Sequence, residues 1–282
     1  MRIKVNQAPI DYLIIGHLTT DLTSRGPLPG GTAAYSALTA QAMGLEVGII
    51  TAGKQEDDLS HLSGIEIIRI PSKTSTVFEN RYTNAGRRQI LKQRAADITF
   101  QIIPDKWKQT PIIHLAPVAQ EVPFPGRDDF PNSILGFSLQ GWLRKWDEKG
   151  TIYPSPLPEF QDTVTPDAVA FLSLEDIGGQ ESWLEAVQAR FPLVLLTKGS
   201  AGVTYFQREL QGDLAAPEAQ EIDPTGAGDI FAASFLINYY LRGKDLQESI
   251  RMGVMLGSWS VSRKGLAGVP GPSVIKSIEK AN

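Results

Sequence analysis

The sequence EIDPTGAGD at residues 221–229 leads directly into the apolar stretch IFAASFLINYYL at residues 230–241. Its apolar spacing predicts a buried helix that begins close to Gly226 and Gly228. Glycine lets a backbone turn sharply and approach a ligand closely, and the first turn of a helix presents unpaired N–H groups and the positive end of the helix dipole. The stretch therefore predicts a phosphate-binding site.

A carboxylate, Asp229, lies at the start of the same predicted helix. A negative charge beside a bound phosphate is unfavourable unless it has a chemical task. The obvious task is to accept a proton from an attacking hydroxyl group, while the helix N–H groups stabilise the charge on the transferred phosphoryl group. The alternative is that Asp229 only caps the helix, and spacing alone leaves both interpretations open.

Short apolar, β-rich segments alternate with helical patterns along most of the chain. The predicted strands are residues 12–16, 46–51, 111–117, 168–173 and 192–197, and the predicted helices are residues 32–44, 179–191, 227–243 and 245–265. This alternation is typical of βαβ units. We therefore predict an α/β fold with a doubly wound, mostly parallel sheet and helices on both of its faces.

Residues 71–100 break this alternation. They carry threonine, aromatic and alternating polar residues around Asn84-Ala85-Gly86, a pattern typical of a hairpin or a small antiparallel sheet. Such a segment would stand off the main domain, either as an ordinary surface hairpin or as a lid over an active site.

The composition disfavours several classes of protein. A net charge of -4 provides no basic face for a nucleic acid, and the absence of cysteine excludes disulfides and thiolate chemistry. The three histidines are scattered and lack the spacing of a metal site. No apolar run approaches the ~20 residues that span a bilayer, and the first residues do not resemble a signal peptide. We expect a cytoplasmic protein with no membrane segment.

The DPTGAGD motif at residues 223–229, followed by a helix rich in small apolar residues, closely resembles the C-terminal signature of the ribokinase-like, or PfkB, carbohydrate kinases. Gly30-Gly31 resembles the family's N-terminal glycine pair, and TKGSAG at residues 197–202 resembles its Thr-x-Gly-x-x-Gly turn. These matches occur in the family's order along nearly the whole chain. The resemblance implies the family's α/β domain with a β lid, and it favours Asp229 as a base over a simple helix cap.

The resemblance also implies a division of the chain. Residues 19–30 and 71–100 are assigned to the β lid, and residues 1–18, 31–70 and 101–282 to the α/β domain that binds nucleotide and substrate.

Individual residues acquire expected roles in the same way. The catalytic candidates are Asp229 as base, with Gly226, Ala227 and Gly228 as an anion hole. The candidates for acceptor binding are Asp21, Gly30, Gly31, Asn80 and Arg144, although a surface arginine beside a packed tryptophan is an equal alternative for Arg144. The candidates for nucleotide binding are Thr197, Gly199, Gly202 and Thr225.

Two positions depart from the family pattern. Tyr35 occupies a position where many members have asparagine, so recognition of the acceptor is expected to differ. The family's Asn-x-x-Glu motif, whose acid helps to hold the water shell of magnesium, has no literal copy, and its nearest counterpart is SLED at residues 173–176. Either Asp176 or Glu175 is expected to serve Mg²⁺, which the nucleotide phosphates would mainly coordinate.

The resemblance implies an ATP-dependent kinase that transfers the γ-phosphate to a hydroxyl group of a small sugar or cyclic polyol, with Mg²⁺. Residues 76–82 and the QGWLR cluster at 140–144 are similar to a subgroup that includes plant inositol kinases, which favours a polyol. The alternatives are a nucleoside kinase of the same fold and a non-catalytic regulator that binds a sugar or nucleotide. An intact Asp229 argues against the regulator. A homodimer formed through the lid is a further expectation.

Overall fold

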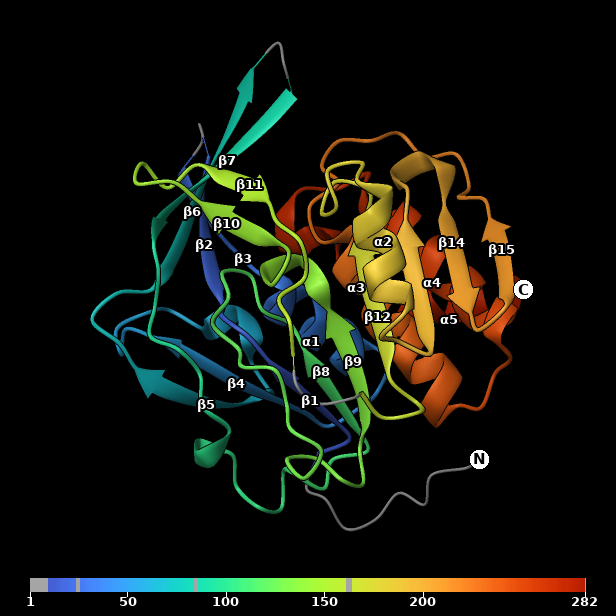
Figure 1. Ribbon diagram of the computed structural model, residues 1–282, viewed down its shortest axis with the longest axis horizontal. Coiled ribbons are helices and arrows are strands. Elements are labelled where there is room, and N and C mark those ends of the chain that lie inside the picture. Colours follow the sequence, from blue (N-terminus) through green and yellow to red (C-terminus); the bar gives the residue numbers. More distant parts are fainter. Residues whose placement is uncertain (1–9, 24–25, 84–85, 161–163, 282) are drawn as a thin grey trace.

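The computed structural model describes residues 10–23, 26–83, 86–160 and 164–281, so residues 84 and 85 of the predicted lid turn lie outside the described residues. A nine-stranded sheet forms the centre of the molecule (Figure 1), in the order β15-β14-β13-β12-β9-β8-β1-β4-β5. Its strands are β1 (Tyr12–Ile15), β4 (Val47–Gly53), β5 (Glu66–Pro71), β8 (Ile112–Leu115), β9 (Ile134–Ser138), β12 (Val169–Ser173), β13 (Leu193–Thr197), β14 (Val203–Gln207) and β15 (Leu210–Leu214).

Within this sheet, the neighbouring strands β13, β12, β9, β8, β1, β4 and β5 are all parallel. Strands β14 and β15 add an antiparallel hairpin at the edge next to β13. The predicted α/β fold with a mostly parallel sheet is therefore confirmed. The edge hairpin was not predicted, because its strands are short and half-exposed and lack a continuous apolar run.

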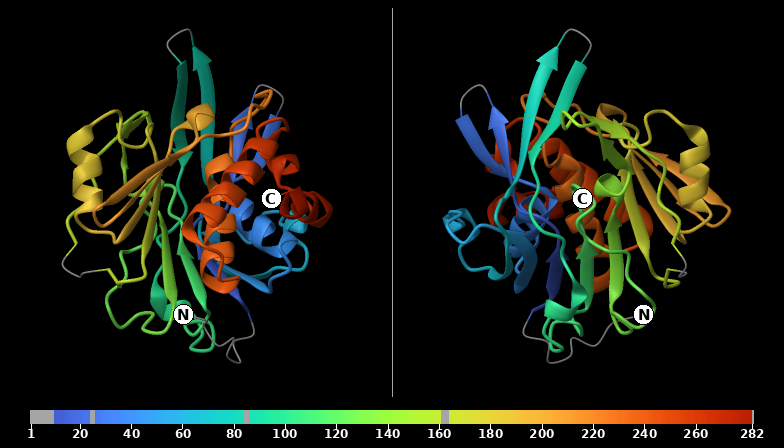
Figure 2. Two further views of the ribbon diagram at one scale, coloured as in Figure 1. Left: turned by 90° about the vertical axis from the view of Figure 1, so that its right-hand side faces the viewer. Right: turned by 60° about the vertical axis from the view of Figure 1, so that its left-hand side comes forward.

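Helices cover both faces of this sheet (Figure 2). The helices are α1 (Thr32–Ala42), α2 (Glu181–Gln188), α3 (Ala227–Leu236), α4 (Leu246–Ser260) and α5 (Pro272–Ala281). One face carries α1, α3, α4 and α5, and the other carries α2 together with long connecting loops. The predicted helix over residues 227–243 ends earlier than expected, because a π-helical turn at Ile237–Leu241 follows α3.

The core has two layers because side chains alternate along each strand. Tyr12 and Ile14 of β1 face the layer under α1 and α3. Leu13 and Ile15 face the opposite layer, where aromatic side chains such as Trp142 are packed. All four β1 side chains are fully buried, which is typical of a central parallel strand.

A second, four-stranded sheet stands above one end of the main sheet (Figure 1), and we call it the lid sheet. Its strands are β2 (Thr19–Thr23), β3 (Gly26–Gly30), β6 (Thr76–Thr83) and β7 (Gly86–Gln93), in the order β3-β2-β6-β7. The pairs β2–β3 and β6–β7 are antiparallel, but β2 and β6 are parallel. The lid sheet is thus mixed rather than purely antiparallel, because the chain crosses the main domain between β3 and β6.

A small hairpin of β10 (Arg144–Trp146) and β11 (Ile152–Pro154) supports the lid sheet from the side. An isolated bridge joins Ile90 of β7 to Thr151, and the N–H of Leu91 donates to the carbonyl of Gly150 at 2.8 Å. Among the described residues, no helix has both the length and the apolar character that crossing a membrane requires.

Candidate active site

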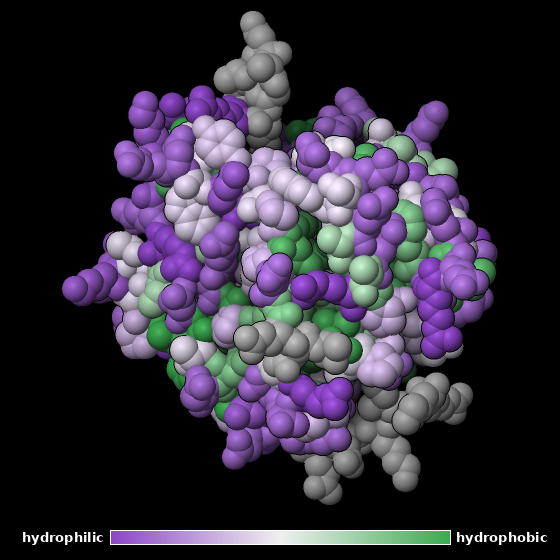
Figure 3. All heavy atoms as spheres, viewed as in Figure 1, coloured by the Kyte–Doolittle hydropathy of each residue, from purple (hydrophilic) through white to green (hydrophobic). Residues whose placement is uncertain are grey.

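A cleft of about 980 Å³ lies between the lid sheet and the carboxyl ends of the central parallel strands. Its walls come from β2, β6, β7, α1, α3 and α4 and from the loops after β9, β12 and β13. The face shown in Figure 3 is mostly hydrophilic, with hydrophobic side chains visible near its centre. Ligands of open α/β folds bind at this edge of the sheet, where the loops converge.

The start of α3 forms part of the cleft floor. Gly226 has a φ of 84°, and a Cβ atom there would lie 2.2 Å from the ring of Tyr35, so both conformation and packing require glycine. Gly228 has no neighbour within 4 Å of such an atom. The backbone at Gly228 is therefore open to the cleft.

The first-turn N–H groups of α3 differ in their partners. The N–H of Ala227 donates to the carbonyl of Pro224 at 3.2 Å, whereas those of Gly228 and Asp229 donate to no backbone carbonyl within the described part of the chain. An anion in the cleft would therefore meet the N–H groups of Gly228 and Asp229 first.

Asp223 holds the approach to α3 in place. Its carboxylate accepts hydrogen bonds from the N–H of Thr225 at 3.0 Å and from the N–H of Gly265 at 2.9 Å. Because these groups belong to two different loops, the carboxylate fixes the glycine-rich turn against the loop after α4. Thr225 itself lines the cleft.

The carboxyl group of Asp229 is half-buried on the cleft floor. Burial raises its pKa to about 7. A hydrogen bond from the Thr32 hydroxyl opposes this rise in pKa. The charges of Asp176 and Asp21 raise the pKa further, and that of Arg144 lowers it. A carboxyl group with a pKa near the operating pH suits general base catalysis.

Asp21 reaches the cleft from the lid sheet. It lies on β2, and a Cβ atom on Gly30 would lie 2.6 Å from its Oδ2 atom. Gly31 has a φ of 92° and lies against the backbone carbonyl of His17. The glycine pair therefore leaves room for a carboxylate and turns the chain from β3 into α1. Gly31 and Asp21 line the cleft, whereas Gly30 is absent from its lining within the described residues.

Arg144 lines the cleft beside Phe78 of the lid sheet. Its guanidinium group lies 5.9 Å from the centre of the Phe78 ring and donates to the carbonyl of Val118 at 3.2 Å. Among the described residues, Asn80 does not line the cleft. Its Oδ1 accepts a hydrogen bond from Gln89 at 3.2 Å, and it is Gln89 that lines the cleft.

The loops after β12 and β13 form the opposite end of the cleft. Thr197, Gly199 and Gly202 all line this end. Gly202 has a φ of 91°, and a Cβ atom there would lie 2.0 Å from the carbonyl of Leu214, so this glycine is required by the backbone. Gly199 has a φ of 57° and no neighbour within 4 Å of such an atom. It leaves the turn open to the cleft.

The predicted metal residues differ in exposure. Asp176 is half-buried, and its Oδ2 accepts hydrogen bonds from the N–H and hydroxyl groups of Ser173, each at 2.8 Å. Glu175 is exposed, although both residues line the cleft. Within the described residues, no group of three His, Cys, Asp or Glu side chains could hold a metal ion. The donor set fits a cation that is held mainly by phosphate and water, with Asp176 as a nearby carboxylate.

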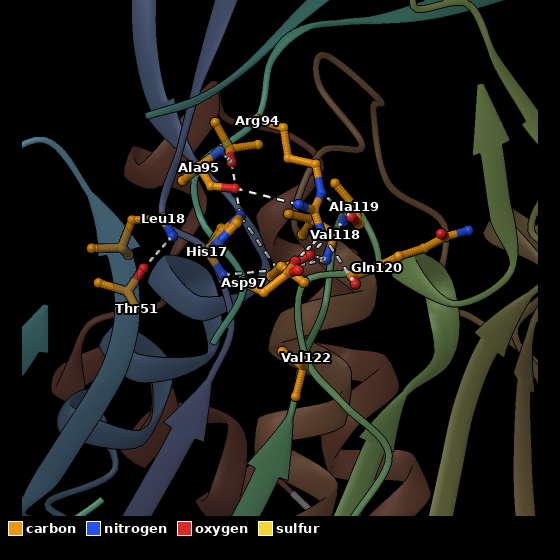
Figure 4. A network of polar contacts seen from close by, with 12 residues as sticks. His17, Leu18, Thr51, Arg94, Ala95, Asp97, Val118, Ala119, Gln120 and Val122 are labelled. Atoms are coloured by element: carbon orange, nitrogen blue, oxygen red, sulfur yellow. Dashed lines mark hydrogen bonds and ion pairs between the residues drawn. The ribbon is translucent and has the colours of Figure 1, made fainter. Parts of the chain in front are cut away.

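A buried polar network joins the lid sheet to the α/β domain (Figure 4). Glu121 is 1% exposed, and it accepts hydrogen bonds of 2.7–3.1 Å from the N–H groups of His17 and residues 118–119. The ring of His17 contacts the hydroxyl of Thr76 at 2.7 Å and the carbonyl of Ala96 at 2.9 Å. These residues lie where the lid strands leave the domain, so the network fixes the position of the lid sheet above the cleft.

Sequence reasoning missed Thr32 and Ser138, which also line the cleft. Thr32 directly follows the glycine pair, so its place at the start of a predicted helix could have drawn attention to it. Ser138 ends β9, and no motif marks it. Tyr35 was noticed, and the structure shows it buried against Gly226.

Comparison with known proteins places this geometry in a family. Residues 165–271 match the model of the pfkB family carbohydrate kinases. Cytidine kinase of Thermococcus kodakarensis is 24% identical over 284 residues, which cover 90% of this chain and 99% of that protein. Fructokinase-2 of Zea mays is 28% identical over 108 residues, which cover 36% of this chain and only 32% of that protein.

Among solved structures, a pyrophosphate-dependent myo-inositol-1 kinase, studied for its conversion into a myo-inositol-3 kinase, is 18% identical and superposes with a TM-score of 0.75. The match covers 96% of this chain and 99% of that chain. This likeness establishes the fold, and the family match and the kinases named above establish the class of enzyme. The resemblance predicted from the motifs is thereby confirmed: residues 165–271 match the pfkB family of carbohydrate kinases, and the chain is a phosphotransferase with the fold of ribokinase-family kinases.

Proposed function

We propose that this kinase transfers the γ-phosphoryl group of ATP to a hydroxyl group of a small sugar or cyclic polyol, with Asp229 as the general base. The observation that carries the proposal is the position of Asp229. Its carboxyl group lies on the cleft floor with a pKa raised to about 7 by burial, beside the exposed N–H groups at the start of α3. A base and an anion hole are thus adjacent, as phosphoryl transfer requires.

In the proposed step, the acceptor oxygen attacks the γ-phosphorus and its proton passes to the Asp229 carboxylate. The bond from the γ-phosphorus to the β,γ-bridging oxygen breaks, and ADP leaves with that electron pair. The N–H groups of Gly228 and Asp229, which donate to no backbone carbonyl in the described part of the chain, would stabilise the negative charge on the transferred group. The hydrogen bond from Thr32 to the carboxylate favours its ionised form, which is the form that accepts the proton.

The donor is assigned to the end of the cleft formed by Thr197, Gly199 and Gly202. The cleft continues from there past residues 216–221 to Val254 and Val261 of the α4 region. This partly apolar extension provides room for a nucleoside, which favours ATP over pyrophosphate as the donor. Mg²⁺ would neutralise the donor phosphates, with Asp176 as a cleft-lining carboxylate that would support its water shell.

The acceptor is assigned to the other end of the cleft, beneath the lid sheet. Asp21 and Arg144 both line the cleft, and both charges act on the pKa of Asp229, which supports this assignment. Carboxylate and guanidinium groups can bind neighbouring hydroxyl groups of a ring. Phe78 and Tyr35 supply flat apolar walls there.

A nucleoside kinase is the second candidate. It is favoured by the similarity to a cytidine kinase, which extends over 90% of this chain. A nucleoside acceptor would place its ribose beside Asp21 and its base against Phe78.

The deciding experiment measures phosphoryl transfer with myo-inositol, D-fructose, D-ribose and cytidine as acceptors. Each acceptor is paired in turn with ATP and with pyrophosphate, and the phosphorylated product is detected by mass spectrometry. We expect turnover with ATP and a sugar or polyol, and turnover with cytidine alone would establish the second candidate. An inactive wild-type protein under all eight conditions would overturn the proposal.

Two further expectations belong to this proposal. A cytoplasmic location supplies ATP, and imaging of a tagged chain in its host cell tests it. A homodimer through the lid sheet is tested by sedimentation of the wild type against a Leu28→Glu variant. Leu28 is 40% exposed on β3, so a dimer through this surface would dissociate in the variant.

A further inference from the structure

A chain of buried polar side chains leads away from the acceptor end of the cleft. Ser138 ends β9, lines the cleft and is 6% exposed. Its Oγ lies 2.8 Å from Nε2 of His114, which is on the neighbouring strand β8. Nδ1 of the same ring lies 2.6 Å from the hydroxyl of Tyr12 on β1. Three adjacent parallel strands thus contribute one connected set of groups.

His114 in the middle of this chain is neutral. Its side chain is fully buried between the rings of Tyr12 and Phe171. Burial lowers its pKa to about 3, so the ring carries one N–H donor and one acceptor at any pH near neutrality. Both ring nitrogens have a hydroxyl partner. The hydrogen bonds from Tyr12 through His114 to Ser138 can therefore be donated in one of two directions.

In one direction, Tyr12 donates to His114 and the ring donates to Ser138, so the Ser138 hydroxyl offers its proton to the cleft. In the other, Ser138 donates to His114, and the oxygen of Ser138 offers only lone pairs to the cleft. Tyr12 then donates to Ser36, with which it is hydrogen-bonded. Ser36 in turn donates to the backbone carbonyl of Asp229 at 3.2 Å.

The hydrogen-bond chain therefore connects the start of α3 with the cleft. One end is the backbone of the proposed base, and the other is a hydroxyl that faces the cleft. Ser138 also pairs with Phe171 of β12, which lines the same space. A sugar or polyol hydroxyl both donates and accepts hydrogen bonds. Because the hydrogen-bond chain can run in either direction, Ser138 can donate to such a hydroxyl or accept from it.

We propose that Ser138 binds a hydroxyl group of the acceptor, and that His114 and Tyr12 are positioning residues that hold the Ser138 hydroxyl in place. This inference rests on the proposed function, because it names a further contact for the acceptor of the same reaction. It adds a specificity-determining group on the floor of the cleft to the carboxylate of Asp21 in the lid sheet.

The first test is kinetic and uses Ser138→Ala. The acceptor is whichever of myo-inositol, D-fructose, D-ribose or cytidine the wild type phosphorylates best. We expect the KM for this acceptor to rise roughly 2- to 13-fold, the usual effect of one hydrogen bond, while the KM for ATP changes less than about 2-fold. His114→Asn should raise the acceptor KM in the same way, and Tyr12→Phe should have a smaller effect.

Ser133→Ala is the matched control. Ser133 directly precedes the same strand, is 8% exposed and donates to the carbonyl of Lys108 at 3.3 Å, but it lies at the end away from the cleft. It should leave both KM values unchanged. An unchanged acceptor KM in Ser138→Ala, in a protein whose Asp229→Asn variant is inactive, would overturn this inference and leave the proposed function intact.

The second test does not depend on turnover. The chain has three histidines, so the ring nitrogens of His114 can be followed by ¹⁵N NMR, with the signal assigned from His114→Asn. Adding the same four acceptors should shift the Nε2 signal in the wild type and leave it in place in Ser138→Ala. The inference is wrong if none of the four acceptors shifts the Nε2 signal of His114. It is also wrong if ATP shifts this signal and the acceptors do not.

Discussion

The two ends of the cleft are built from different parts of the chain. At the end that we propose for the donor, the groups expected to bind it belong to the backbone, in the glycine turns at 199–202 and 226–228. At the acceptor end they are side chains such as Asp21 and Arg144, supplied by separate elements. A backbone-made site leaves a contiguous glycine motif in the sequence, whereas a site made by convergent side chains leaves scattered single residues. The donor end is therefore the part that a motif can identify.

Asp229 lies where these two ends meet, and its replacement should have the largest effect. We expect Asp229→Asn to lower kcat by at least ~100-fold, the usual loss when a general base is removed. The asparagine is nearly isosteric, so ATP affinity by calorimetry and the melting temperature should be preserved. Near-normal turnover of the folded variant would reduce Asp229 to a helix cap.

Substitutions at the two glycines at the start of α3 distinguish a loss of phosphate binding from a loss of folding. Valine at Gly228 would project into open space, because no atom lies within 4 Å of a Cβ there. We expect Gly228→Val to fold normally and to lose at least about 100-fold in kcat/KM for ATP, since the side chain would occupy the phosphate position.

Gly226→Val is the matched control for this prediction. Its Cβ would lie 2.2 Å from the Tyr35 ring, at a φ of 84° that valine rarely adopts. This variant should have a lower melting temperature than the wild type, measured by circular dichroism, whereas Gly228→Val should not. Normal ATP use by a folded Gly228→Val protein would show that the anion hole lies elsewhere.

Asp21 tests the acceptor end. Charge-assisted hydrogen bonds are worth roughly 1.5–3 kcal/mol each, so Asp21→Ala should raise the acceptor KM by roughly 10- to 150-fold. The KM for ATP and the melting temperature should stay close to those of the wild type. A melting temperature many degrees lower, with an unchanged acceptor KM, would make Asp21 a structural residue of the β2–β3 hairpin.

The same contrast explains what the sequence could predict. The hydrophobic pattern located β1, β4, β8, β12 and β13, since strands buried on both faces are short continuous apolar runs. The parallel strands β5 and β9 were not among the predicted strands, and β5 is only half-buried at the edge of the sheet. The DPTGAGD motif located the helix start and Asp229. The hairpin β14–β15 was not predicted, because β15 is largely exposed and lacks an apolar run. Helix α5 was not predicted either, although its residues form a clear amphipathic pattern.

The acceptor end was predicted only in part. Asp21 and Gly31 line the cleft as expected, whereas Asn80 pairs with Gln89, which was not foreseen as a lining residue. A side chain in a strand reaches one face or the other according to its register, and the register of the lid sheet follows from pairing over long sequence distances. Ser138 depends on the order of β8, β9 and β12, which no local pattern encodes.

The smallest predicted effect concerns two charges, one from each end of the cleft, that change the pKa of Asp229. Because a general base must be ionised, kcat/KM should rise with pH through the pKa of Asp229, which is about 7. Asp176, from the donor end, raises this pKa by its negative charge. Asp176→Asn should therefore lower the pKa and shift the rising limb of the pH–rate profile to lower pH.

Arg144, from the acceptor end, lowers the same pKa by its positive charge. Arg144→Gln should therefore raise it and shift the rising limb of the profile to higher pH, opposite to Asp176→Asn. Both profiles are measured as kcat/KM for the acceptor between pH 5 and 9 at saturating ATP, so that they report the pKa of Asp229 before the acceptor binds. Opposite shifts are the expected result, because the charge of Asp176 raises the pKa of Asp229 and that of Arg144 lowers it. Shifts in the same direction, or a limb that stays in place in both variants, would assign the rising limb to another group and leave the role of Asp229 to rest on its own substitution.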